Sequence, residues 1–271
     1  MSIRDRARTG LQALPRRLRR RLGSRGIRRE DIELQSLVGY RIAGTIWRAP
    51  GARTAIILTP GTNDPGSVFE GWTQPVNAME IASLGYVCAH FDPAGRGRSW
   101  GEEDYGGPEH QDDLRVVIEH LRPQVESLGV LSISLGIAMA AGALTEDLGV
   151  DWLLDWEGPC DREIICAGGR MMAPALGHDL EDDTYWCPRE AVVHVPRLRC
   201  GYVRVQSSRD HAQPGELRHA TRMIEAAAGG DLPFFHLNEH GDGVVPEEPD
   251  WYAPGRAVAN RTLLGWVQRL T

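Results

Sequence analysis

The sequence predicts an α/β protein in which a mostly parallel sheet is covered by helices on both faces. Short apolar runs recur along the chain without polar alternation, as expected of strands that are buried on both sides. Segments with apolar residues at helical spacing lie between these runs, so strands and helices alternate. In such sheets ligands bind beyond the carboxyl ends of the strands, and we therefore expect reactive residues directly after strands.

The strands are predicted from apolar runs that end at Gly, Pro or polar residues. Residues 31–50 predict two short strands joined by a glycine turn. The later runs are TAIILTPG (54–61), GYVCAHFDP (85–93), GVLSIS (129–134), VDWLLDWEGP (150–159), GYVRVQSSRD (201–210) and LPFFHLNEH (232–240).

The helices are predicted from apolar spacing and from residues that begin or end a helix. In the segment 108–121, Leu114, Val117 and Leu121 fall on one face, which predicts an amphipathic helix. The segment 214–230 begins with Pro and stops at Gly-Gly. A further amphipathic pattern at 253–270 closes the chain.

Charge divides the chain into a basic segment, residues 1–30, and a globular domain, residues 31–271. The basic segment has eleven arginines against Asp5 and Glu30, a net charge of +9, whereas the whole chain has a net charge of −7. Within the globular domain, the interval at about 160–200 interrupts the alternation and is rich in Cys, Met, Trp and acidic residues. We interpret this interval as a cap inserted over the strand ends.

The basic segment has two open interpretations. Residues 1–29 either contact an anionic membrane or an acidic protein surface, or form a basic tail that only aids solubility. The segment has no apolar core of the kind found in secretory signals. Nucleic acid is not an expected partner, because the rest of the chain is acidic and phosphate binding requires a positive face.

Composition excludes several classes of protein. No run approaches the ~18 apolar residues that a membrane span needs. The five cysteines are odd in number and lack a CxxC pair, which disfavours a disulfide framework or a zinc site and favours a cytoplasmic location. All thirty basic residues are arginine, which excludes a lysine nucleophile. The acidic stretch GHDLEDD (177–183) lacks regular ligand spacing, so we expect no metal and no cofactor.

Ser134 is the candidate nucleophile. It lies between the predicted strand and a helix of small residues in GVLSISLGIAMAAGAL (129–144), as a sharp strand–turn–helix nucleophile elbow requires. So tight a turn brings the positions two before and two after the serine together. Ser132 and Gly136 occupy these positions, and both are small.

Two residues that follow later strands complete a catalytic triad. A serine hydroxyl is a weak nucleophile and needs a base, which is itself oriented by a carboxylate. Asp210 follows the strand that begins at Gly201, and His240 follows the last strand. The chain order Ser134, Asp210, His240 is the order expected for this elbow. His211, His236 and Asp242 are interpreted as structural or surface residues.

Four segments of the sequence resemble the serine α/β-hydrolase superfamily, in its esterase, thioesterase and serine-aminopeptidase-like group. They are LTPGTND (58–64), FDPAGRGRSWG (91–101), LSISLGIA (131–138) and VQSSRDHAQP (205–214) followed by His240. The resemblance covers about residues 31–271. It implies an α/β-hydrolase fold with a cap insertion, and a serine hydrolase activity.

The resemblance also implies an oxyanion hole. The family uses a backbone N–H from the turn after an early strand and another from the residue after the nucleophile, which correspond here to Thr62 and Leu135. Pro60 stands where the family usually has histidine, and Ser132 where glycine is usual. The turn from Asp92 to Gly101 resembles the family's Asp-x-x-Gly-x-Gly-x-Ser turn, which is a backbone device and not a phosphate site.

Several residues keep alternative roles. Asp155 or Glu157 is the rival of Asp210 as the acid, because some members of the superfamily place it after that strand. If Asp210 is the acid, Trp156 and Glu157 become candidates for the wall of the substrate pocket, where Glu157 could bind a substrate amine or serve only in packing. The cap residues Met171, Met172, Tyr185 and Trp186 either line an acyl pocket or attach the cap to the domain.

The sequence therefore predicts a hydrolase that acts on a small-molecule acyl substrate through an acyl-enzyme. A carboxylic ester is the first substrate class. A thioesterase and an aminopeptidase-like peptidase are the enzymatic alternatives, because nothing in the elbow or the oxyanion turn separates them. A catalytically inactive binding module with the same fold is the alternative from another class.

Overall fold

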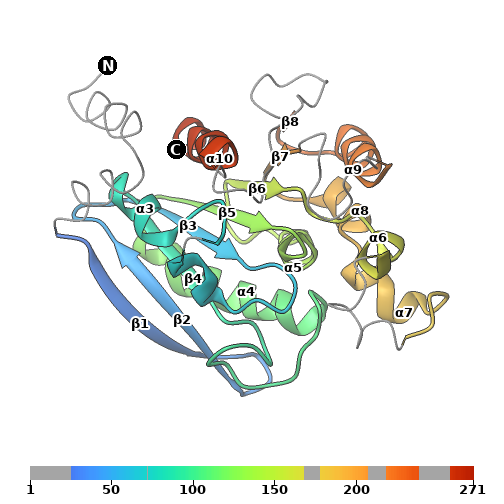
Figure 1. Ribbon diagram of the computed structural model, residues 1–271, viewed down its shortest axis with the longest axis horizontal. Helices are drawn as coiled ribbons and strands as arrows, with labels where there is room; N and C mark the ends of the chain where they lie inside the picture. The colour runs from blue at the N-terminus through green and yellow to red at the C-terminus, as the bar shows by residue number, and fades with distance from the viewer. Residues whose placement is uncertain (1–25, 72, 168–177, 207–217, 238–256) are drawn as a thin grey trace.

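The computed structural model describes residues 26–71, 73–167, 178–206, 218–237 and 257–271 (Figure 1). Its strands form one eight-stranded sheet in the order β1-β2-β4-β3-β5-β6-β7-β8. The first two pairings, β1 with β2 and β2 with β4, are antiparallel, and all the others are parallel. The strands are β1 (Arg28–Gln35), β2 (Arg41–Arg48), β3 (Thr54–Thr59), β4 (Val87–Phe91), β5 (Ser127–Ile133), β6 (Trp152–Trp156), β7 (Gly201–Val205) and β8 (Phe235–Leu237).

Burial explains why the central strands lack a polar alternation. Every residue of β4, β6 and β7 is buried, because both faces of the sheet are covered. One face packs against α4 (Pro108–Leu121), α5 (Gly136–Ala143), α8 (Ala191–His194) and α9 (Arg218–Ala228). The other face packs against α3 (Ala78–Ser83) and α10 (Ala257–Leu270). The predicted mostly parallel sheet, with helices on both faces, is confirmed.

The parallel strands give the sheet two different edges. We call the edge at which β3 to β8 end the carboxyl edge, and the edge at which they begin the amino edge. The register pairs Thr59 of β3 with Ser132 of β5, and Ser132 with Asp155 of β6. The segments that follow these strands therefore emerge side by side at the carboxyl edge.

The helix α4 has the bounds that the sequence predicts. Pro108 occupies its first turn, where a missing N–H is tolerated, and its face of Leu114, Val117 and Leu121 is fully buried. The sheet begins slightly earlier than expected, because β1 starts at Arg28. The last three residues of the predicted basic segment 1–30 therefore belong to the sheet.

The interval predicted as a cap contains short helices between β6 and β7. They are α6 (Arg162–Ala167), α7 (Asp183–Trp186), η5 (Cys187–Arg189), α8 and η6 (Val195–Arg197). Trp186 is fully buried in a cluster with Leu135 and Ala138, the residues at the start of α5. Arg162 forms an ion pair with Glu190 at 2.7 Å. Tyr185 and Trp186 thus attach this interval to the domain, and Met171 and Met172 lie outside the described residues.

Within the described part of the chain, no helix is both long and apolar enough to cross a bilayer. All five cysteines are free thiols, and Cys88, Cys160 and Cys200 are buried. Burial raises the pKa of the Cys160 thiol to about 11 and that of Cys200 to about 12, so both are unreactive at neutral pH.

Candidate active site

Ser134 has the backbone conformation of a nucleophile elbow. Its φ is +53°, in the left-handed region that a residue with a side chain rarely adopts. β5 ends one residue before it, and α5 begins two residues after it. Its N–H donates to the carbonyl of Trp156 at 3.1 Å, and its own carbonyl accepts from the N–H of Ile137. Hydrogen bonds on both sides thus hold the serine in this strained turn.

The small residues around Ser134 are required by close backbone contacts. A Cβ atom on Gly136 would lie 2.7 Å from the carbonyl oxygen of Thr59 and 2.8 Å from that of Pro60. Ser132 is fully buried on the strand below, where its hydroxyl lies 3.5 Å from a carboxylate oxygen of Asp155. The prediction that only small side chains fit on either side of the serine is consistent with these contacts.

The turn after β3 lies directly against Ser134. A Cβ atom on Gly61 would lie 3.2 Å from Cβ of Ser134 and 3.8 Å from its Oγ. Thr62 follows in the same turn, and Leu135 follows Ser134 at the start of α5. The turn that carries Thr62 thus lies beside Ser134 and Leu135, which are the candidate nucleophile and the other predicted oxyanion donor.

Backbone strain is concentrated at this edge of the sheet. Among the described residues, four that are not glycine have a positive φ, between +48° and +56°. Asn63 follows β3, Tyr105 follows β4, Ser134 follows β5 and Glu157 follows β6. Strained residues persist where the surrounding structure holds them, and they cluster at functional sites. This pattern marks the carboxyl edge along the four neighbouring strands β4, β3, β5 and β6.

The turn from Asp92 to Gly101 is the backbone device that the sequence predicts. The carboxylate of Asp92 accepts from the N–H of Gly66 at 2.8 Å and from that of Arg98 at 2.9 Å. Gly97 has a φ of +52°, and a Cβ there would lie 2.5 Å from this carboxylate. Asp92 therefore joins the segment after β3 to the segment after β4.

Two buried side chains of α4 hold the rest of this loop. His110 accepts from the N–H of Gly106 at Nδ1, and its Nε2 lies 3.0 Å from the carbonyl oxygen of Ala94 and 3.3 Å from the backbone nitrogen of Asp104. Burial lowers the pKa of His110 to about 4. Asp113 accepts from the N–H of Ala94 and from the hydroxyl of Tyr40. Burial raises the pKa of Asp113 to about 6.

Asp155, a rival for the catalytic acid, forms a buried ion pair within the sheet. Its carboxylate accepts from the Arg204 guanidinium and from the hydroxyl of Tyr202 at 2.8 Å, and all three side chains are fully buried. Arg204 also donates to the carbonyl of Gly158 at 3.1 Å. These contacts tie the end of β6 to β7 and hold Asp155 in a buried ion pair.

Glu157 and Trp156 occupy different environments. Glu157 is fully buried directly after β6, with a φ of +50° and its N–H bonded to the carbonyl of Val205. The indole of Trp156 packs in the core cluster that includes Leu263 and Leu264 of α10. Trp156 thus contributes to the elbow through its backbone carbonyl, while its indole forms part of the core.

The other predicted members of the triad lie outside the described residues. Asp210 comes five positions after the end of β7, and His240 three positions after the end of β8. His211 and Asp242 are also outside. His236 lies inside β8, where its ring stacks on Trp266 with centroids 5.4 Å apart, in keeping with a structural role.

The sequence interpretation missed the charged pair of Arg96 and Glu103, which lies behind the oxyanion turn. Arg96 sits in a Gly-Arg-Gly stretch that predicts a turn, and nothing in that stretch shows where the side chain points. The strain at Tyr105 has no signal in the sequence, because tyrosine rarely adopts a positive φ, whereas Asn63 belongs to a residue type that does so more often.

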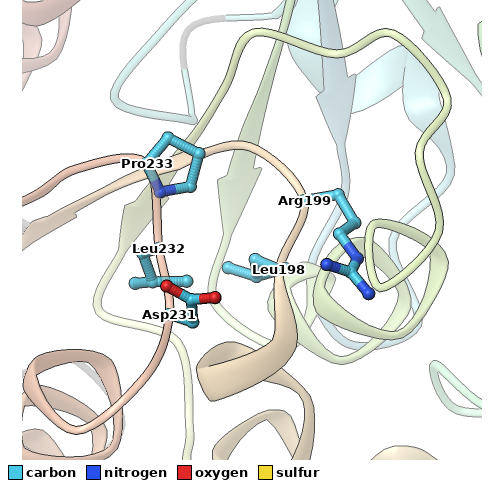
Figure 2. A pocket seen from close by; sticks show the side chains of 5 residues that line it. All are labelled: Leu198, Arg199, Asp231, Leu232 and Pro233. Carbon is cyan, nitrogen blue, oxygen red and sulfur yellow. The ribbon is translucent and has the colours of Figure 1, made fainter.

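A hollow at the amino edge contrasts with this site. It has a volume of about 330 Å³. It lies between the segments that precede β7 and β8 and is lined by Leu198, Arg199, Asp231, Leu232 and Pro233 (Figure 2). It carries no nucleophile and lies at the opposite end of the strands from Ser134. In the described part of the chain, no group of three or more His, Cys, Asp or Glu residues could hold a metal ion.

Comparison with known sequences gives a limited match. No protein-family profile matches the chain. A segment of 97 residues is 32% identical to polyketide transferase grgF from a Penicillium species. This match spans 36% of the chain and 30% of the length of that relative.

Comparison with solved structures extends over most of the chain. Esterase Pf2001 of Pyrococcus furiosus aligns with a TM-score of 0.68 at 15% identity, over 90% of this chain and 91% of that chain. Puromycin hydrolase aligns with a TM-score of 0.67 at 15% identity, over 90% of this chain and 39% of that chain. Acylaminoacyl peptidase of Pyrococcus horikoshii aligns with 0.65 at 14% identity, over 90% and 42%. The resemblance to the serine α/β-hydrolases is thus confirmed in the fold.

Proposed function

We propose that the chain is a serine hydrolase that cleaves a carboxylic ester through an acyl-enzyme. The observation that carries this proposal is the left-handed backbone of Ser134, held between β5 and α5 with Gly61 packed against it. Strain of this kind, of order 1–3 kcal/mol, persists only where the surrounding structure maintains it. A serine that served only in packing would not require it.

In the proposed mechanism Ser134 Oγ attacks the carbonyl carbon of the substrate while His240 accepts its proton. Asp210 orients the imidazole and stabilises the imidazolium. The N–H groups of Thr62 and Leu135 stabilise the oxyanion, and His240 then passes the proton to the leaving alcohol. Water activated by the same histidine hydrolyses the acyl-enzyme. The site requires no metal or cofactor for these steps.

The test is hydrolysis of a p-nitrophenyl ester by Ser134→Ala. We expect kcat to fall at least about 10³-fold with the fold intact, because the nucleophile is lost. Ser127→Ala is the matched control: Ser127 lies at the amino end of the same strand, bonded to Asp151 at 2.6 Å. Full activity of Ser134→Ala would contradict the proposal. Failure of a fluorophosphonate probe to label Ser134 would favour a catalytically inactive binding module.

Thioesters and amides are the alternative substrates within the same mechanism. Glu157, buried beside the elbow, is the proposed partner of a substrate amine if the chain is an aminopeptidase-like peptidase. A panel of esters, thioesters and aminoacyl amides, compared by kcat/KM, separates these classes. Glu157→Gln should weaken only the aminoacyl substrates, whereas an equal loss on all substrates would indicate a packing role.

A second candidate function is acyl transfer to an acceptor other than water. The partial match to a polyketide transferase favours it. In this case the acyl-enzyme at Ser134 would be attacked by an alcohol or amine instead of water. Product analysis by mass spectrometry in the presence of alcohol and amine acceptors tests this function. Transfer products that depend on Ser134 would support it, and free acid as the sole product would oppose it.

The basic N-terminal segment is proposed to contact an anionic surface. Residues 1–25 lie outside the described residues, whereas Arg29 belongs to β1 and pairs with Asp31 and Glu70. A deletion should therefore stop at residue 25, so that the sheet stays intact. Salt-sensitive binding of the full chain to anionic vesicles, lost in this deletion, would support the proposal. Unchanged binding would contradict it.

A further inference from the structure

Arg96 lies behind the oxyanion turn, with its guanidinium almost fully buried. Its Nη1 donates to the carbonyl oxygen of Gly61 at 2.7 Å and lies 3.4 Å from that of Asp64. A buried guanidinium is rarely directed at backbone carbonyls without a reason, because its desolvation must be offset by hydrogen bonds. Here the bonds go to the turn that packs against the nucleophile.

Glu103 fixes the orientation of this guanidinium. Its two carboxylate oxygens accept from Nε and Nη2 of Arg96, each at 2.6 Å, so the pair forms a planar two-bonded fork. The same carboxylate accepts the N–H of the strained Tyr105 at 2.8 Å. Burial opposes ionisation of Glu103, but the bonds and charge of Arg96 hold its pKa below the ordinary value. The fork therefore remains charged at neutral pH, with Nη1 left to reach Gly61.

The carbonyl of Gly61 and the N–H of Thr62 belong to one peptide group. The group is trans, so the two bonds point in opposite directions from one rigid plane. A charged donor that holds the carbonyl also fixes the direction of the N–H. Donation to the carbonyl further polarises the amide, and hydrogen bonds in such a chain strengthen one another.

We propose that Arg96 is a positioning residue that aims and polarises the Thr62 N–H toward the oxyanion formed when Ser134 attacks. The proposal rests on the function proposed above. Arg96 acts from the far side of the peptide and does not contact the substrate. The role of Glu103 is to hold the guanidinium in place.

The test begins with Arg96→Met, assayed on the p-nitrophenyl ester. We expect kcat to fall about 10²-fold while KM changes less than about threefold, because an oxyanion donor acts in the transition state and removal of one typically costs about 10²–10³ in kcat. Arg98→Met is the matched control. The Arg98 guanidinium lies on the same turn and bonds to Asp31 and Gly44, with Asp92 at 3.6 Å and no hydrogen bond to Gly61. Because Asp92 keeps its bonds to the backbone N–H groups of Gly66 and Arg98, this variant should retain the kcat of the unsubstituted protein.

A trifluoromethyl ketone supplies a readout that a purely structural role would not change. This inhibitor forms a tetrahedral adduct with the serine, and its oxygen ionises in the oxyanion hole. In Arg96→Met its affinity should fall by the same factor as kcat/KM. The pH at which the bound adduct ionises, followed by fluorine NMR, should rise. An adduct that ionises at the same pH in both proteins would overturn the proposal.

A second variant covers the case in which Arg96→Met does not fold because Glu103 is left without its partner. Arg96→Met/Glu103→Gln removes both charges together and should show the same loss of kcat. Glu103→Gln alone keeps Arg96 near Gly61 and should show a smaller loss. A folded double variant with unchanged kcat would overturn the role of Arg96 and leave the hydrolase function standing, provided that Ser134→Ala is inactive. An inactive unsubstituted protein would instead contradict the proposed function.

Discussion

The two edges of the sheet differ in which residues adopt left-handed backbone conformations. At the amino edge the described turns use glycine: Gly51 before β3, Gly85 before β4 and Gly149 before β6. At the carboxyl edge, glycines after β4 also adopt it, and in addition four residues with side chains occupy the same region of φ, one after each strand from β3 to β6. Glycine reaches this conformation without strain, whereas other residues lose about 1–2 kcal/mol. The carboxyl edge keeps side chains where stability alone would select glycine.

Buried charge follows the same division. Arg96 with Glu103 and Arg204 with Asp155 lie at or just below the carboxyl edge. The hollow of Figure 2 at the amino edge has an exposed arginine, Arg199, and an exposed acid, Asp231. A hollow by itself is therefore a poor guide to the site in this protein. Strain and desolvated charge, which both reduce stability, distinguish the edge at which the candidate nucleophile Ser134 lies.

The largest effect on stability should come from breaking the buried pair at the carboxyl edge. Arg204→Met leaves the Asp155 carboxylate without its cation, and we expect the free energy of unfolding to fall by about 3–5 kcal/mol. Arg199→Met, on the exposed amino edge, should change it by less than about 0.5 kcal/mol. Urea unfolding measures both variants. Equal, small losses would show that buried charge does not separate the two edges.

Gly136→Ala tests the close packing beneath the elbow. The added methyl group would meet the carbonyl oxygens of Thr59 and Pro60, which are backbone atoms and cannot rotate away. We expect a loss of about 2–3 kcal/mol in the free energy of unfolding, in the range of other overpacked sites, and a large loss of activity. Thermal unfolding and an ester assay measure these changes. A stable, active variant would mean that the turn is looser than described.

Asp113 should give the loop at the carboxyl edge a dependence on pH. Because burial raises its pKa to about 6, the folded protein favours the neutral carboxyl. The stability that this group contributes is present below its ordinary pKa and is lost as the pH rises through about 6. Asp113→Asn stays neutral, so its stability relative to the unsubstituted protein should improve by about 2 kcal/mol from pH 4 to pH 7.

Urea unfolding at several pH values measures the difference in free energy of unfolding between the two proteins. The contribution of His110 cancels in this difference, because both proteins contain that residue. Asp112→Asn removes the same charge from the adjacent position, where Asp112 pairs with Arg115, and controls for the change in net charge. If the difference in free energy of unfolding between Asp113→Asn and the unsubstituted protein did not change with pH, the raised pKa of Asp113 would be contradicted.

The smallest effects compare strain directly at the two edges. Ser134→Gly removes a side chain from the left-handed region and should raise the free energy of unfolding by about 1 kcal/mol while activity is lost. Gly51→Ala adds a methyl group at a φ of +67°, where no atom lies within 4 Å. It should lower the free energy of unfolding by about 1 kcal/mol and leave the activity unchanged. If the free energy of unfolding changed in the same direction in both variants, the proposed difference in backbone strain between the two edges would be refuted.

The sequence by itself determined the order of strands and helices and the position of the elbow. Apolar runs without alternation report burial on both faces, and small residues around Ser134 report a tight turn, so both are local properties of the chain. It also separated the basic segment 1–30 by charge. The sequence leaves the role of Asp155 open, because an acid after a strand looks the same whether it is catalytic or paired.

Only the tertiary structure decided which distant groups meet. Asp155 finds Arg204 and Tyr202 on the neighbouring strand, and Arg96 reaches the carbonyl of Gly61 across a loop. Left-handed backbone at Asn63, Tyr105 and Glu157 is likewise imposed by surrounding contacts, since none of these residue types requires it. Such interactions depend on segments far apart in the chain, whose approach is set by sheet register and helix packing. Local sequence patterns therefore do not predict these contacts.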